Sequence, residues 1–268
     1  MKKIRLLVLV LLILSGSLYG CTKEAPLKDS GLEDNSNNTS NNEDNKNQVF
    51  LADVIDSKDG LLITPDKDSI ESSSSDRISV ATGEAEIIDD KGNVINVDVL
   101  KSGDRIKVSY DGMIAESYPA QITANKIELL GRNNLIDGFL ALIDDLYQTD
   151  SGLNGGITMI AFDTTDWTML SAIETEIILA IAKEEYKLEV LVGTFDELAE
   201  QELIDKDNLY FENGILIVIE EIEINNDKDK ISCSIRKWRS GLGAIGWDAE
   251  ARLTKDKWEI TRSGMWIS

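Results

Sequence analysis

The spacing of apolar residues changes once along this chain, and this change constrains the fold more than any other feature. Between residues 49 and 131, apolar and polar residues alternate in short runs separated by glycine-containing turn sequences. A period of two is typical of β-strands that bury one side. From Leu135 onward, Phe139, Leu142 and Leu146 follow at helical spacing. The sequence therefore predicts a β domain followed by a domain that contains helices.

The first domain is predicted to be a small closed barrel of the OB type, because five or six short strands fall within roughly eighty residues. The second is predicted to be an α+β domain with helices and an antiparallel meander. Capping-box sequences at Ser171 and at Thr194 predict two helix starts. Three long strands are expected after them, over residues 214–224, over 230–239 continued through 247–253, and over 258–267.

The N-terminus has the layout of a secretory signal, with a basic start and an apolar run over residues 6–14. Leu18-Tyr19-Gly20-Cys21 resembles the lipobox of bacterial lipoproteins. The resemblance implies a diacylglycerol on Cys21, removal of residues 1–20, and attachment to the outer face of the cell membrane. An ordinary cleaved signal and an uncleaved anchor are the alternatives, but the apolar run is too short for a bilayer core of about 30 Å.

Residues 21–48 are rich in Asn and acidic residues and are predicted to form a disordered tether, because they contain too few apolar residues to form a core. The expected organisation is a signal peptide (1–20), the tether (21–48), an OB-like β domain (49–131) and an α+β domain (132–268).

Composition excludes several classes of function. Removing three basic signal residues from the 27 Lys and Arg leaves 24 against 49 Asp and Glu, a formal charge near −25 that disfavours nucleic-acid binding. The chain has no histidine, so Ser-His-Asp catalysis and His-containing zinc sites are excluded. No cofactor or metal is predicted. Cys233, the one thiol besides Cys21, lies in an alternating run and is expected to be buried.

Two runs of the first domain carry a resemblance to a known family. They are Gly103-Asp104-Arg105-Ile106-Lys107-Val108 and Glu116-Ser117-Tyr118-Pro119-Ala120-Gln121. Residues 49–131 resemble the YobA-like domain of unknown function in secreted proteins of Gram-positive bacteria, which implies an OB-like fold and no established activity. On residues 207–214 and 237–244, the second domain resembles uncharacterised C-terminal regions of other secreted proteins.

The candidate binding residues are Arg236, Lys237, Trp238 and Arg239, which place three cations beside a glycine-rich run in an acidic chain. A cationic pocket flanked by tryptophan suits a carboxylate, a phosphate or a stacked ring. Lys237 and Arg239 share one face of the predicted strand, and this face is the preferred site. The alternative is that the glycines form a bulged bend and the cations pair with nearby carboxylates.

No catalytic residue is identified, and two functions remain. The first is a membrane-anchored, extracytoplasmic lipoprotein acting as a non-catalytic binding module for a protein or a small anionic ligand. The alternative is a cell-envelope hydrolase that uses carboxylates alone. A deep cleft with two converging, partly buried carboxylates would favour the hydrolase.

The lipid anchor predicts a specific effect of Cys21→Ala. Without the thiol no diacylglycerol can be attached, so the protein should be released from membranes or remain as an uncleaved precursor. Membrane fractionation with an alkaline wash measures the release, and mass determination of the N-terminus shows whether the precursor is cleaved. Cleavage after Gly20 together with persistent membrane attachment in this variant would contradict the anchor.

Overall fold

The computed structural model describes residues 47–268. The predicted signal, Cys21 and nearly all of the tether lie outside the described residues. The first strand begins at Gln48, the last residue assigned to the tether. Within the described residues, no helix is long and apolar enough to cross a membrane.

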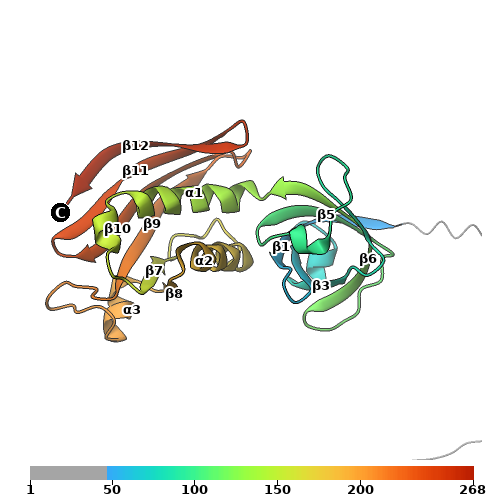
Figure 1. Ribbon diagram of the computed structural model, residues 1–268, viewed down its shortest axis with the longest axis horizontal. Coiled ribbons are helices and arrows are strands. Elements are labelled where there is room, and N and C mark those ends of the chain that lie inside the picture. The colour runs from blue at the N-terminus through green and yellow to red at the C-terminus, as the bar shows by residue number, and fades with distance from the viewer. Residues whose placement is uncertain (1–46) are drawn as a thin grey trace, which may run out of the picture. The chain divides into compact units, whose positions relative to one another are not determined.

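The first half of the described chain forms a closed five-stranded barrel, shown in blue to green in Figure 1. Strand β1 pairs antiparallel with β2 and β5, β2 with β3, and β5 with β6, and a parallel pairing of β3 with β6 closes the barrel. A short sixth strand, β4, joins β6. The OB-like prediction is confirmed. The strands are β1 (Gln48–Asp56), β2 (Leu61–Pro65), β3 (Ile78–Ala81), β4 (Glu86–Ile88), β5 (Asp104–Tyr110) and β6 (Ala120–Arg132).

The alternation of buried and less buried residues along the strands explains how the barrel core forms. In β5, Ile106, Val108 and Tyr110 are buried while the residues between them are half-buried. The core collects such residues from all six strands. The Tyr110 hydroxyl donates a hydrogen bond of 2.9 Å to the buried Glu71 carboxylate, which lies in a short 3-10 helix, Glu71–Ser73. Burial and this acceptor raise the pKa of Tyr110 to about 12.

The second half forms a six-stranded sheet in the order β12-β11-β10-β9-β7-β8. Strands β9 to β12 make the predicted antiparallel meander, and β7 pairs parallel with β8 and β9. We refer to this as the second sheet. Its strands are β7 (Met159–Asp163), β8 (Glu189–Val192), β9 (Gly214–Ile224), β10 (Lys230–Ser240), β11 (Gly243–Thr254) and β12 (Lys257–Ile267).

One expectation for this sheet was wrong, and one strand was missed. The single strand expected over 230–253 is two strands, because the chain reverses at Gly241 and Leu242 and β10 and β11 then pair with each other. Strand β8 was not predicted, because its four residues lie at the sheet edge and show no burial alternation. Cys233 is buried on β10 as expected, and burial raises the pKa of its thiol to about 12.

Three helices accompany the second sheet: α1 (Asn134–Gln148), α2 (Ala172–Tyr186) and α3 (Phe195–Glu200). Both predicted capping boxes are present, at the starts of α2 and α3. Helix α1 packs on β10, β11 and β12 (Figure 1). Its apolar side chains form one core with those of α2 and the sheet. Because α1 starts two residues after β6 ends, the barrel and the second sheet are joined by a very short segment.

Candidate functional site

A cleft of about 790 Å³ opens between the barrel and the N-terminal ends of α1 and α2. Both sheets belong to the same compact unit of the chain. The cleft is lined by the loop after β2, by Arg105 of β5, by the starts of α1 and α2, and by the turn between β9 and β10.

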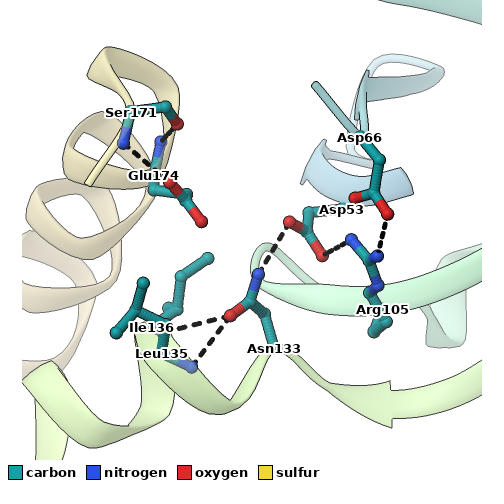
Figure 2. Close-up of polar contacts among 8 residues, drawn as sticks. All are labelled: Asp53, Asp66, Arg105, Asn133, Leu135, Ile136, Ser171 and Glu174. Carbon is teal, nitrogen blue, oxygen red and sulfur yellow. Dashed lines mark hydrogen bonds and ion pairs between the residues drawn. The ribbon is translucent and has the colours of Figure 1, made fainter. Parts of the chain in front are cut away.

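A network of four polar side chains lies at this cleft, and we call it the Asp53 network (Figure 2). The Arg105 guanidinium donates to Asp53 Oδ1 at 3.1 Å and also pairs with Asp66. The Asn133 side-chain amide donates to Asp53 Oδ2 at 2.7 Å. Asp53 is only 5 % exposed. Both oxygens of this buried carboxylate are therefore engaged by donors from two other elements.

The strand pairing explains how Asp53 and Arg105 meet. They are directly opposite each other on β1 and β5. Their neighbours Ala52 and Ile106 face the barrel core, so Asp53 and Arg105 face outward. Opposite charges at facing positions stabilise a strand pair. Asp53 is nevertheless buried, because it faces the start of α1 instead of solvent.

Asn133 has two roles at the start of α1. Its side-chain oxygen accepts hydrogen bonds from the backbone N–H groups of Leu135 and Ile136, which caps the helix. Its side-chain nitrogen donates to Asp53. The carboxylate thus lies beside a helix N-terminus, where the helix dipole favours negative charge. One asparagine therefore fixes both the start of α1 and the position of a barrel strand.

Burial raises the pKa of the Asp53 carboxyl above its ordinary value. The positive charge of Arg105 and the hydrogen bonds from Asn133 and Arg105 oppose this shift, whereas the nearby negative charge of Glu174 adds to it. Glu174 belongs to the capping box of α2, where its carboxylate accepts a hydrogen bond of 2.7 Å from the Ser171 backbone N–H (Figure 2). Asp53 therefore helps to fix the start of α1 at the cleft, and Glu174 fixes the start of α2 there.

The remaining charges of the cleft are mostly negative. Arg105 is paired as described, and Arg132 pairs with Asp104 and Asp137 outside the lining. The other lining cations are Lys67 and Lys228; the other lining carboxylates, apart from Asp53 and Asp66, are Asp68, Asp76, Glu174 and Asp227. Within the part of the chain that the structure describes, no group of three or more acidic or cysteine side chains is arranged to hold a metal ion.

The four predicted binding residues lie elsewhere, on β10, and none of them lines the cleft. Lys237 is fully buried, and its ammonium donates to the carbonyl oxygens of Tyr147, Thr149 and Asp150 and to the side-chain oxygen of Asn154. It therefore binds the free carbonyls at the end of α1. Burial lowers the pKa of Lys237 to about 8, and the Asp150 charge opposes this shift.

The neighbours of Lys237 are engaged in a similar way. Arg239 donates to the carbonyl oxygens of Leu153, Gly155 and Glu212. Arg236 pairs with Glu220 on the other face of the sheet, as the alternative interpretation expected for the cations. Trp238 packs against Phe195 at a ring-centroid distance of 5.0 Å. Ligand binding by these residues stays a prediction, and the structure gives each of them a contact within the chain.

Sequence reasoning missed the Asp53 network. The available signal was a single charged residue, Asp53, inside the apolar run 49–55, together with Asn133 directly before the helical pattern. Such a charge in a strand marks either a solvent-facing position or a buried partner. Deciding between these requires knowing which strand lies opposite and which helix covers that face. Neither is visible in the local pattern.

Comparison with known proteins finds a match for one part of the chain. Residues 51–131 match the family model described as "Protein of unknown function (DUF3221)", which spans most of the barrel. No curated protein and no solved structure matches the chain. The barrel is therefore similar to an uncharacterised domain.

The buried ammonium of Lys237 predicts a large effect of Lys237→Met. Methionine has a similar length but no donor, so the acceptors at the end of α1 lose their partner. A buried acceptor left without a donor costs about 1–3 kcal/mol, and we expect the free energy of unfolding to fall by about 3 kcal/mol in urea denaturation. Arg236→Met, at the adjacent position, removes a partly exposed ion pair and should cost at most about 1 kcal/mol. Equal losses for the two variants would contradict the structural role of Lys237.

Proposed function

We propose that this chain is a lipoprotein of Gram-positive bacteria, held at the outer face of the cell membrane by a diacylglycerol on Cys21. Its folded part, the barrel and the uncharacterised second domain, acts as a non-catalytic binding module. The signal layout and the lipobox-like run before Cys21 support the anchor. The match of the barrel to a domain of unknown function is compatible with a binding module and identifies no chemistry.

The observation that carries the binding proposal is the cleft with the Asp53 network at its wall. A ligand site needs a concave surface with a few fixed polar groups. The cleft provides this, because Arg105 is held between Asp53 and Asp66. Asp53 already has a donor at each oxygen, so it is suited to holding neighbouring groups in place.

The charges of the lining favour a ligand with a cationic group. After the internal pairs are set aside, four carboxylates remain against Lys67 and Lys228. Three of these carboxylates, Asp68, Asp76 and Asp227, are exposed to solvent. The acidic chain as a whole also repels anions. We therefore propose a small polar ligand, or a segment of another protein, that carries positive charge. The anionic ligand expected at residues 236–239 remains a separate prediction.

A thermal-shift experiment tests this proposal with spermidine, citrate and trehalose as cationic, anionic and neutral probes. A ligand at 100 times its Kd stabilises the folded state by about 2.7 kcal/mol. For a domain of this size that corresponds to a rise in Tm of roughly 5–10 °C. We expect this rise with spermidine alone, and we expect Asp76→Asn/Asp227→Asn to reduce it strongly.

The matched control removes two exposed carboxylates that do not line the cleft, in Glu200→Gln/Glu212→Gln. Both double variants change the net charge equally, so a non-specific effect of charge would reduce the shift in both. Equal reductions, or a shift with citrate or trehalose in place of spermidine, would contradict a cation-binding cleft.

A carboxylate hydrolase is the second candidate, and one observation favours it. Burial raises the pKa of Asp53, which lies in a cleft where Glu174 adds negative charge. A carboxylic acid with a raised pKa and a second carboxylate can act as general acid and base. Turnover of chromogenic glycosides or esters that both Asp53→Asn and Glu174→Gln abolish would favour this candidate. The binding proposal predicts no such turnover.

A further inference from the structure

We propose that the cleft opens and closes by rotation of the barrel against the second sheet and its helices, about a hinge at residues 131–133. The backbone at the end of β6 is irregular, because a bulge interrupts its pairing with β5 just before Gly131. Gly131 has φ of +121°, and a Cβ atom added there would meet no other atom within 4 Å. Only glycine adopts this conformation readily, and the open space around it leaves room for the dihedral angles to change.

The hydrophobic cores of the two halves are almost separate. The barrel core contains buried residues between Phe50 and Ile127 only. In the core of the second sheet, Ile55 is the one buried residue from the barrel, with the half-buried Leu62 packed beside it. Interfaces between domains that bury little apolar surface permit relative motion. Rotation about the hinge would therefore leave both cores nearly intact.

The contacts close to the hinge are short and would act as the pivot. The Asn133 backbone N–H donates to the Gly103 carbonyl at 2.9 Å, and the Asn133 side chain donates to Asp53. Arg132 donates to the Ser102 carbonyl at 2.9 Å. These bonds lie within two residues of Gly131, so a rotation there displaces their atoms least. They keep the start of α1 on the barrel while the rest of the cleft changes width.

Two ion pairs join the barrel to α2 and would hold the closed state. Lys58 pairs with Glu184, and Arg77 pairs with Glu176. The Lys58 and Glu184 side chains are 68 % and 61 % exposed, whereas Arg77 is 21 % exposed and donates to both oxygens of Glu176. Exposed ion pairs contribute little to stability and weaken in salt. In the proposed motion the structure represents the closed state, and these charged contacts hold it.

Such an arrangement suits a site that responds to a ligand. A ligand shifts a two-state equilibrium only if it binds one state more tightly. Here the cleft is lined from both sides of the hinge, by the loop after β2 on the barrel and by the start of α2. A ligand that touches both walls binds the closed state preferentially. The motion is a property of the chain alone, so its test does not depend on the proposed ligand.

Distance measurement by pulsed electron resonance tests the hinge in the mature chain with Cys21→Ser. Nitroxide labels at Ser73→Cys and Asn226→Cys, exposed positions next to the cleft lining, report its width. Labels at Ser73→Cys and Val94→Cys, both on the barrel, are the matched control. Cys233 is buried with a pKa raised to about 12, so it should not be labelled.

Reversing one partner of each ion pair, in Lys58→Glu/Arg77→Glu, should shift the Ser73–Asn226 distances to longer values and deplete the short population. Restoring the pairs in swapped order, by adding Glu184→Lys and Glu176→Arg, should recover the short population. In the chain whose ion pairs are unmodified, 1 M salt should also lengthen the Ser73–Asn226 distances. This measurement keeps the test valid if the reversed variant folds poorly. The Ser73–Val94 distances of the barrel control should not change. A Ser73–Asn226 distribution that neither reversal nor salt changes would overturn the hinge.

Discussion

The hydrogen bond between Asn133 and Asp53 is the interaction on which the arrangement of this molecule depends. Strand β6 passes almost directly into helix α1, so the direction of α1 is set by the few residues between them. Asn133 begins the helix by capping Leu135 and Ile136, and it ties that start to strand β1 through Asp53. The position of α1 then determines where β10, β11 and β12 can pack. Breaking this bond would leave one oxygen of the buried Asp53 carboxylate without a donor.

The same constraint explains where the cleft lies. The loop after β2 and the starts of α1 and α2 converge around the Asp53 network, and no apolar core fills the space between them. The network supplies fixed polar groups at one wall, while the exposed carboxylates of the lining stay open to solvent. The proposed ligand-binding surface therefore shares residues with the network that stabilises the fold. This limits which of them can be tested by mutation without disturbing the fold.

The barrel and most of the second sheet could be predicted from the sequence, because both follow from local periodicity. Alternation in residues such as Ile106, Val108 and Tyr110 indicates a strand with one buried face, and the Ser171 and Thr194 boxes indicate helix starts. The site could not be predicted in this way. Asp53 and Arg105 are 52 positions apart, and their pairing depends on strand register.

Residues 236–239 show the same limit of prediction from local sequence, here for residues that do stand out. Arg236, Lys237 and Arg239 stand out in an acidic sequence, and a pattern of this kind suggests an anion site. In the structure Lys237 lies under the end of α1, about ninety residues away along the chain, where it satisfies carbonyl groups that the helix leaves free. A local charge pattern cannot distinguish these uses, because the acceptors come from another element.

A double-mutant cycle between Asp53 and Asn133 tests the central interaction most directly. The free energy of unfolding is measured by urea denaturation for Asp53→Ala, Asn133→Ala, the double variant and the unaltered chain. Residues that share a buried hydrogen bond show a coupling energy of about 0.5–3 kcal/mol, and we expect a value of about 1 kcal/mol or more here. Losses that add within about 0.5 kcal/mol would show that the two residues act independently. That result would contradict the role of this bond in joining the barrel to α1.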